Sequence, residues 1–237
     1  MGDELGAAPQ AIRVSSEVPP NAGISSSAAL LVAVAAGLKP ELDGREAALA
    51  CQRAEQKATG VQVGVMDQFA SALGRRGSAL LLDCATLEYE MVPFPDEVAI
   101  AVIDSGEHRS LASTPYNQRR REAESGHPKR RRHVDSEIAR VRAFVDALHE
   151  RAFARMGELL KESHASLRDD FEVSTPGVDA LVQRAWNAQG CYGARIMGAG
   201  FGGSVLALVD RRQMRPFLRD FGHSVLFCTT ADGPYAR

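Results

Sequence analysis

Residues 19–29 read PPNAGISSSAA, and this stretch is the most informative feature of the sequence. We expect an extended strand at residues 11–18 before it and an apolar, alanine-rich helix at residues 26–38 after it. Gly23 lets the backbone approach an anion, the serines supply hydroxyl and N–H groups, and a helix N-terminus carries the positive end of its dipole. The stretch therefore predicts a phosphate-binding loop, although a helix that is simply capped by serine has a similar sequence.

A second glycine-rich stretch, ARIMGAGFGGS, spans residues 194–204 and runs into the apolar residues 205–209. Such glycine density indicates positive φ angles or a backbone packed close to another segment, because an ordinary turn needs fewer glycines. The glycines precede the apolar segment, which reverses the strand-glycines-helix order of dinucleotide-binding folds. No GxxxxGK[ST] loop is present, so a P-loop fold is not expected. The glycines in question are Gly198, Gly200, Gly202 and Gly203.

Composition limits the classes of function. The chain has 237 residues, 45% of them hydrophobic, which is enough for one or two domains with a sizeable core. Its 28 basic and 30 acidic residues give a net charge of −2, which argues against nucleic-acid and membrane partners. The basic run at residues 126–133 could be a nuclear or nucleic-acid signal, but short basic runs more often lie on solvated surfaces. Four cysteines without C-x-x-C spacing and the lack of a signal peptide favour a cytoplasmic protein.

The hydrophobic pattern predicts alternating helices and strands, with no internal repeat. Besides the segments above, we expect helices at residues 45–59, 66–73, 136–155 and 178–189. We expect paired strands at 78–83 and 88–92, a buried strand at 98–104, a turn plus strand at 193–209 and a last strand at 225–229. In the helix at 136–155, the apolar face carries Ile138, Val141, Val145 and Leu148.

The two glycine- and serine-rich stretches together resemble the GHMP kinases, and other stretches resemble the galactokinase family within them. Those stretches are residues 60–69 (GVQVGVMDQF), 103–111 (IDSGEHRSL), 116–122 (YNQRRRE) and 163–174 (SHASLRDDFEVS). The resemblance covers nearly the whole chain from about Ile12. It implies an α+β protein with the GHMP kinase fold. In this interpretation residues 1–97 form a partial ribosomal-protein-S5-like N-terminal domain, and residues 98–237 form a ferredoxin-like C-terminal domain.

The resemblance also implies roles in phosphoryl transfer, where positioning and charge neutralisation carry the catalysis. Asp67, in the MDQF stretch, would be the catalytic carboxylate that accepts or orients the substrate hydroxyl. Glu55 and Ser27 would hold Mg²⁺, which prefers carboxylate, hydroxyl, phosphate and water oxygens. The alternatives are that Asp67 is a helix N-cap and that Glu55 lies on a solvated helix face.

The remaining site residues follow from the same resemblance. The residues that would bind the phosphates of ATP are Gly23, Ser25, Ser26, Ser27 and Ala28. Gly64, Asp67 and Tyr116 would contact the sugar, although Tyr116 could equally be a domain-boundary tyrosine. The glycines of residues 198–203 would keep the backbone close to the phosphate loop and shape the site.

The implied reaction is the ATP- and Mg²⁺-dependent phosphorylation of the anomeric hydroxyl of galactose. One alternative is a kinase for a related sugar, namely N-acetylgalactosamine, arabinose or a uronic acid, and another is a non-catalytic sugar or nucleotide sensor. Galactokinases carry a sugar-binding GRxNLIGEHTDY motif near the N-terminus, and this chain starts downstream of it. The GEH at residues 106–108 does not replace that motif, because no TDY follows. We therefore expect a fragment, a truncated product or half of a split protein, with impaired activity; the oligomeric state is left open.

Overall fold

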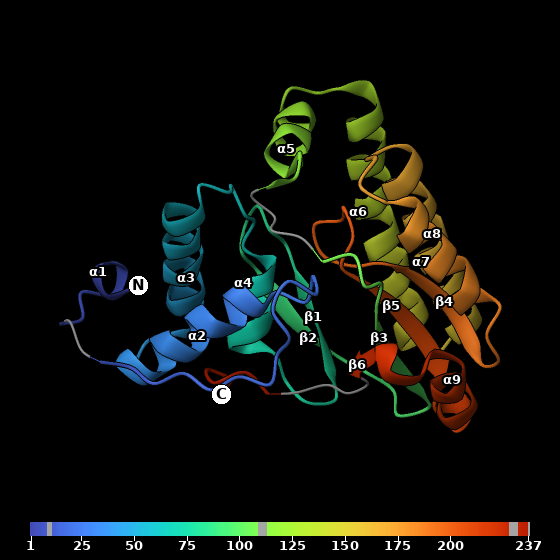
Figure 1. Cartoon of the computed structure of the whole chain (residues 1–237), viewed down its shortest axis with the longest axis horizontal. Coiled ribbons are helices and arrows are strands. Elements are labelled where there is room, and N and C mark those ends of the chain that lie inside the picture. Colours follow the sequence, from blue (N-terminus) through green and yellow to red (C-terminus); the bar gives the residue numbers. More distant parts are fainter. Residues whose placement is uncertain (9–10, 109–112, 228–231, 237) are drawn as a thin grey trace. The chain divides into compact units, whose positions relative to one another are not determined.

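The computed structural model describes residues 1–8, 11–108, 113–227 and 232–236 (Figure 1). Contacts between Cα atoms divide the chain into two units. Unit 1 comprises Met1–Pro20, Ser25–Phe94 and Thr230–Arg237, and unit 2 comprises Asn21–Ile24 and Pro95–Thr229. The main change of unit, at residues 94–95, lies close to the boundary expected after residue 97. The segment Asn21–Ile24 belongs to the second unit, although its neighbours on both sides belong to the first.

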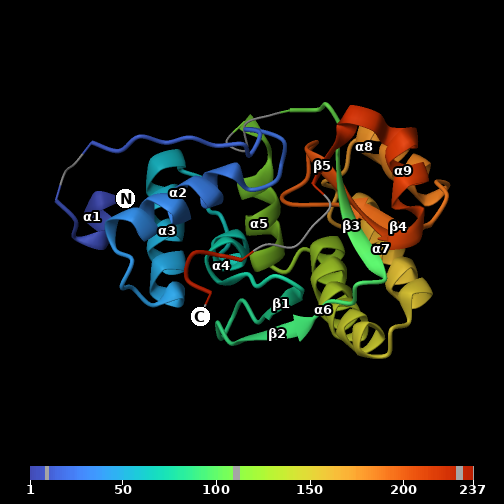
Figure 2. The same ribbon diagram turned by 90° about the horizontal axis from the view of Figure 1, so that it is seen from below.

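Unit 1 is a small group of helices with a two-stranded antiparallel hairpin (Figure 2). Its elements are α1 (Gly2–Leu5), α2 (Ser26–Leu38), α3 (Gly44–Thr59), α4 (Met66–Leu73), β1 (Ser78–Leu82) and β2 (Tyr89–Pro93). Local sequence explains the limits of α3, because the Asp43 carboxylate accepts hydrogen bonds from the first-turn N–H groups and Gly60 ends the helix at φ 70°. The core contains Val32, Cys51 and Phe69, and Tyr235 from the C-terminal segment joins it.

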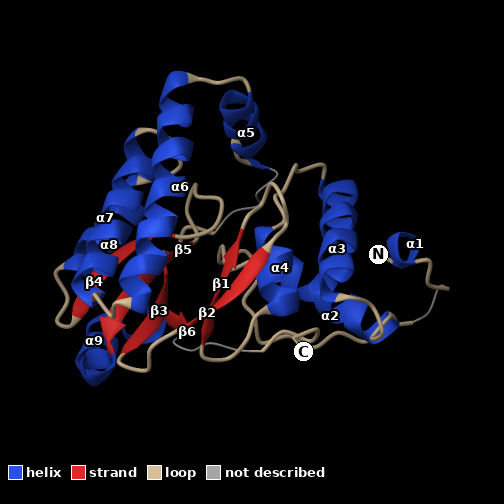
Figure 3. Ribbon diagram, turned by 180° about the vertical axis from the view of Figure 1, so that it is seen from behind, coloured by secondary structure: helices blue, strands red, loops and turns tan. Residues whose placement is uncertain are grey.

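Unit 2 contains a four-stranded antiparallel sheet in the order β4-β5-β3-β6 (Figure 3). The strands are β3 (Val98–Asp104), β4 (Cys191–Ile196), β5 (Ser204–Asp210) and β6 (Val225–Phe227). The helices are α5 (Tyr116–Glu124), α6 (Pro128–His149), α7 (Phe153–Asp169), α8 (Pro176–Trp186) and α9 (Met214–Phe221), with short 3₁₀ turns at Arg211–Gln213 and Gly222–Ser224. Numbered within the unit, this strand order is 2-3-1-4, the ferredoxin-like arrangement.

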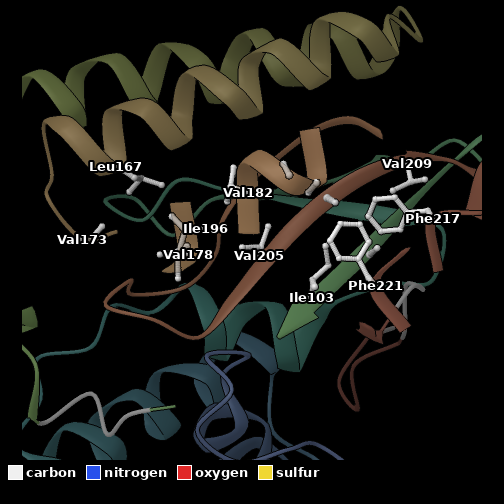
Figure 4. Packing of buried hydrophobic residues seen from close by; sticks show 14 residues of the cluster. Ile103, Leu167, Val173, Val178, Val182, Ile196, Val205, Val209, Phe217 and Phe221 are labelled. Carbon is white, nitrogen blue, oxygen red and sulfur yellow. The ribbon is translucent and has the colours of Figure 1, made fainter. Parts of the chain in front are cut away.

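The core of unit 2 lies between the sheet and its helices (Figure 4). Ile103, Val205 and Val209 of the strands meet Val178 and Val182 of α8 there. Helix α7 approaches β4 closely enough to need glycine on both sides. A Cβ atom on Gly157 would come within 2.2 Å of the Tyr192 carbonyl oxygen, and one on Gly193 within 2.1 Å of the Gly157 carbonyl oxygen.

Polar side chains lie where α6 and α7 pack together and against β4. Glu137 of α6 accepts hydrogen bonds from Arg195 of β4 (2.8 Å) and from the Ser163 hydroxyl of α7 (2.6 Å). Buried His133 lies 3.0 Å from the Ser166 hydroxyl. Each of these polar groups has a hydrogen-bond partner, which offsets the cost of removing it from water. The contact of α6 with α7 and β4 at this point buries little apolar surface.

Histidine burial in unit 2 predicts a loss of stability on mild acidification. Burial lowers the pKa of both His133 and His164 below 6.5, although Glu137 and Asp179 act in the opposite direction. Below about pH 6.5 the unfolded chain therefore binds more protons than the folded chain. The free energy of unfolding should be fully developed above that pH and should fall by up to about 1.4 kcal/mol per pH unit for each histidine below it.

Urea unfolding of the chain at pH 7.5 and at pH 5, followed through unit 2, measures this loss. The single tryptophan, Trp186, is the probe because its ring lies 5.8 Å from that of His164. The variant with both His133→Asn and His164→Gln should lose less stability over the same interval. An equal loss in the wild type and the variant would assign the pH dependence to other groups.

Several predicted elements are confirmed by the structure. Helices α2 and α4 and strand β3 have the expected bounds, and α3 and the β1–β2 pair differ from expectation by a residue or two at their ends. Helix α8 and strand β6 are also present where expected, although residues 228–229 of the last predicted strand lie outside the described residues.

Other predictions were wrong. Residues 11–18 form no strand, because no described strand runs alongside them, and Ile12 and Val14 are exposed. Residues 193–209 hold the end of one strand and the whole of the next, since β4 and β5 pair as a hairpin around the glycines. The helix expected at 136–155 starts at Pro128 and ends at His149, and Arg151, at φ 56°, separates it from α7. Of its expected apolar face, Leu148 is buried and Val145 half-buried, whereas Ile138 and Val141 are exposed.

Candidate functional site

The predicted phosphate loop has an unusual backbone. Asn21, Gly23 and Ser25 have φ angles of 62°, 72° and 60°, all in the left-handed region, which side chains disfavour. Alternation of left-handed residues with ordinary ones turns successive N–H groups to one side, and such concave backbone segments bind anions. Alternating left-handed residues are typical of such segments, and the anion-binding role of this loop stays a prediction.

The glycine-rich connection between β4 and β5 packs on this loop inside unit 2. A Cβ atom on Gly23 would lie 3.0 Å from the Gly203 Cα, and the Ser204 hydroxyl donates a 2.6 Å hydrogen bond to the Ala22 carbonyl oxygen. A Cβ atom on Gly198 would come within 2.9 Å of the Gly23 carbonyl oxygen. The glycines of this connection have positive φ angles and close backbone contacts, as their density predicted: Gly198, Gly200, Gly202 and Gly203.

The start of α2 is not an ordinary serine cap. Ser25 is the N-cap residue, but its side chain makes no capping hydrogen bond. The first backbone bond of the helix runs from the Ala29 N–H to the Ser25 carbonyl, and no described residue accepts a bond from the N–H groups of residues 26–28. Those N–H groups, together with the helix dipole, are what a phosphate group binds at a helix N-terminus.

Glu55 of α3 is buried, and no lysine, arginine or histidine of the described residues lies in an ion pair with it. Only 8% of its surface is exposed, which rules out the alternative of a solvated helix face. One carboxylate oxygen accepts a 2.6 Å hydrogen bond from the Ser27 hydroxyl, and the other accepts a 2.7 Å bond from the Gln68 amide. No described Lys, Arg or His forms an ion pair with it, and a buried charge without a counter-ion is costly. Ser27 itself is exposed, so a hard cation could reach both oxygens.

Gln68 is a member of this cluster that the sequence analysis did not single out. It is 1% exposed, and its own Oε1 atom is buried without a partner among the described residues. An unsatisfied buried acceptor costs about 1–3 kcal/mol, which offsets the stability that the bond to Glu55 contributes. The available sequence signal was the position of this amide next to Asp67 in the MDQF stretch. Its burial in the structure is unusual, since glutamine is mostly exposed in proteins.

Asp67 lies in the first turn of α4, next to Gln68. The alternative that it caps the helix is wrong, because Val65 is the N-cap residue and no side chain caps this end. Its half-buried carboxylate has no hydrogen-bond or ion-pair partner among the described residues. The bond between Gln68 and Glu55 ties the first turn of α4 to α3, and so fixes the turn that carries Asp67.

The two remaining residues that were predicted to contact the sugar, Gly64 and Tyr116, belong to different units of the chain. Gly64 lies in the loop before α4 in unit 1, and a Cβ atom there would meet nothing within 4 Å. Tyr116 is half-buried and is the first residue of α5 in unit 2. Their roles stay predictions.

Comparison with known proteins identifies GHMP kinase domains in both the N-terminal and the C-terminal part of the chain. The family profile "GHMP kinases N terminal domain" matches residues 1–75, and "GHMP kinases C terminal" matches residues 144–223. A galactokinase of Roseiflexus sp. is 39% identical over 266 residues, which cover 93% of this chain and 68% of that protein. The chain belongs to the galactokinase family of GHMP kinases.

Further relatives agree. A galactokinase of Chloroflexus aggregans is 41% identical over 86% of this chain and 62% of its own length. The crystal structure of Lactococcus lactis galactokinase complexed with galactose matches with a TM-score of 0.80 at 30% identity, over 92% of this chain and 68% of that one. An L. major mevalonate kinase, at 19% identity and a TM-score of 0.64, shares the fold. This galactokinase-family chain thus spans about two thirds of the length of the relatives it matches.

Family membership confirms the expected fold class and the interpretation of the chain as a sugar kinase of the galactokinase type. The structure places Ser27, Glu55 and Asp67 in unit 1, on three successive helices whose first two are joined by a hydrogen bond. No described helix is both long and apolar enough to cross a membrane.

Gly23→Val should weaken nucleotide binding and also destabilise the loop. A valine at φ 72° is strained, and its Cβ would press on the Gly203 and Ser204 backbone, at a cost of about 1–3 kcal/mol. Titration with a fluorescent ATP analogue measures the affinity, and thermal unfolding measures the stability. Gly37→Val is the matched control, because a Cβ atom on that residue of α2 meets nothing within 4 Å. Unchanged affinity in folded Gly23→Val would make the stretch a helix start and nothing more.

Proposed function

We propose that this chain transfers the γ-phosphoryl group of ATP to the anomeric hydroxyl of galactose, with Mg²⁺ as the metal ion. Two thirds of a galactokinase's length matches this chain, and both ends of the match carry the family's sequence signals. The observation that supports the proposal most strongly is the state of Glu55. A buried carboxylate that binds an exposed serine hydroxyl and lacks a cation is suited to hold Mg²⁺ beside a phosphate group.

The proposed site uses few residues, each for one task. The N–H groups at the start of α2, from Ser26 to Ala28, would bind the phosphate oxygens, and Gly23 would keep the preceding backbone close to them. Ser27 and Glu55 would hold the Mg²⁺ ion, which neutralises phosphate charge and orients the γ-phosphoryl group when bound. Gln68 would hold Glu55 in place, because its amide donates to the carboxylate oxygen that Ser27 does not use.

Asp67 would accept the proton of the sugar's anomeric hydroxyl group. As the anomeric oxygen forms its bond to the γ-phosphorus and the bond from that phosphorus to the ADP oxygen breaks, the hydroxyl proton passes to the Asp67 carboxylate. That carboxylate has no other described partner to compete for the proton position. Gly64 would leave room for the sugar, and Tyr116 would offer a ring face and a hydroxyl to it.

Galactose is the proposed acceptor because each of the more similar relatives is described as a galactokinase. We also propose a cytoplasmic location, since the described cysteines, Cys51, Cys84 and Cys191, are free thiols, as in reducing compartments. No observation favours N-acetylgalactosamine, arabinose, a uronic acid or a sensor function over this reading.

The test is an assay of the purified 237-residue chain with Mg²⁺, ATP and one sugar at a time. Phosphorus NMR identifies a sugar 1-phosphate directly, and coupled detection of ADP gives the rate. We expect galactose to be the preferred acceptor among galactose, N-acetylgalactosamine, arabinose and galacturonic acid. Preference for another sugar would replace galactose, and ATP binding without any sugar phosphate would contradict the catalytic proposal.

A further inference from the structure

Over residues 130–141, helix α6 turns polar side chains inward and apolar side chains outward, whereas Ala147 and Leu148 near its C-terminal end are buried. The side that packs in unit 2 carries Arg130, His133, Glu137 and Arg140, and these residues are buried or half-buried. The opposite side carries Val134, Ile138 and Val141, which are 39%, 52% and 43% exposed. Surface helices usually show the reverse pattern, so this face is one that another surface would cover.

The outward face has the spacing of a coiled-coil helix. Val134, Ile138, Val141 and Val145 follow one another at intervals of four, three and four residues, which is the a/d pattern of a heptad repeat. We call these four residues the apolar seam. The seam covers less than two heptads of this 22-residue helix, because Arg131 occupies the preceding position of the repeat and Leu148, at the following position, is buried within the chain. The described residues of this chain leave the first three seam residues exposed and Val145 half-buried.

We propose that the apolar seam is the contact between two copies of this chain, with the two α6 helices packed antiparallel about a two-fold axis. In that arrangement Ile138 of each copy lies opposite Val141 of the other, and Val134 lies opposite Val145. A two-fold contact must be self-complementary, because each residue pair occurs twice. Four medium-sized aliphatic side chains per copy make a small interface, so the expected dimer is weak.

Charges beside the seam fit this arrangement. Asp135 and Arg142 are both exposed and flank the seam on the same side, at equivalent heptad positions. The antiparallel register places Asp135 of each copy next to Arg142 of the other. Arg142 has no described partner within the chain, and Asp135 has only an exposed pairing with Arg131 at 3.5 Å. Charges flanking a seam set the orientation of the partner helix, so this pair favours a second copy.

A parallel pair is not supported by the same residues. Parallel packing would need Glu137 on the opposite flank of the seam to meet Arg142 of the other copy. Glu137 is already engaged within unit 2, where Ser163, Arg140 and Arg195 bind its carboxylate at 2.6–2.8 Å. Its withdrawal from those partners would leave Arg195 unpaired.

Analytical ultracentrifugation of the full 237-residue chain, from about 1 to several hundred µM, tests the proposal by measuring the dimer dissociation constant. Ile138→Glu places a charge in the seam of each copy and should raise the dissociation constant at least about 100-fold. Ala139→Glu adds the same charge one residue further along the helix, outside the seam, and should change it by no more than about 2-fold. Thermal unfolding of both variants checks that unit 2 is intact.

A charge exchange tests the orientation. Arg142→Glu should raise the dissociation constant about 10-fold, because each Asp135 then faces a like charge. Asp135→Arg in addition to Arg142→Glu should restore it to within about 3-fold of the parent. A chain that stays monomeric at every concentration, or association that Ile138→Glu leaves unchanged, overturns the proposal. Failure of the double exchange to restore association overturns the antiparallel arrangement.

Discussion

Asp67→Asn should lower the rate of sugar phosphorylation about 10²- to 10⁴-fold and leave the affinity for ATP nearly unchanged. The amide keeps the size of the side chain but cannot accept the hydroxyl proton. The stability cost should be small, about 0.3–1 kcal/mol, because the structure shows only a favourable position in the first turn of α4. The measurement is coupled ADP release with galactose, alongside nucleotide titration and thermal unfolding of the same preparation.

Asp3→Asn is the control for this experiment. It makes the same chemical change at a side chain that is 92% exposed, and it should leave turnover as it was. Asp67→Asn turnover within a factor of about three of the parent would remove Asp67 as the catalytic carboxylate. A loss of ATP affinity that matches the loss of turnover would instead give Asp67 a binding role.

Glu55→Gln should have opposite effects on activity and stability. Turnover should fall about 10²- to 10³-fold, and the Mg²⁺ concentration needed for half-maximal rate should rise, because a neutral amide is a poor ligand for a hard cation. The free energy of unfolding without Mg²⁺ should rise by about 0.5–2 kcal/mol. The reason is that a buried charge without a counter-ion is removed, while glutamine can still bond both Ser27 and Gln68.

These opposite signs separate the two possible roles of Glu55. A purely structural carboxylate would lose stability on substitution and leave the Mg²⁺ dependence alone. Glu46→Gln, at an exposed position in the first turn of the same helix, is the control; it should leave the Mg²⁺ dependence unchanged and lower the free energy of unfolding by no more than about 0.3–1 kcal/mol. A stability loss in Glu55→Gln with an unchanged Mg²⁺ requirement would contradict the proposed metal role.

Much of unit 1 could be predicted from sequence because its signals are local. Asp43 before α3 and Gly60 after it mark both ends of one helix, and Gly74 ends α4. The motif residues Ser27, Glu55 and Asp67 were found through the family resemblance. Spacing alone left Glu55 as a solvated residue and Asp67 as a cap, and burial and capping geometry in the structure contradict both of those alternatives.

The sequence predictions failed where segments far apart in the chain determine whether a residue forms a strand or becomes buried. Residues 11–18 have strand-like composition, but a strand needs a neighbour for its backbone hydrogen bonds, and no described strand lies there. The apolar period of α6 predicted the helix, but it did not predict that Leu148 is buried while Ile138 and Val141 are exposed. A helical period predicts which residues share a face of the helix. Which face is buried depends on the contacts with α7 and β4, where Glu137 binds Ser163 and Arg195.

The amino-acid sequence was sufficient to predict the family and the fold class, because glycine and serine patterns with special backbone needs are local and specific. The catalytic and metal-binding roles of Ser27, Glu55 and Asp67 stay predictions. Only the tertiary structure showed that Gln68 binds Glu55, that Glu55 is buried without a cation, and that Gly23 packs on Gly203. Those facts depend on segments far apart in the chain. Burial and pairing are properties of the packed fold, and no local pattern encodes them.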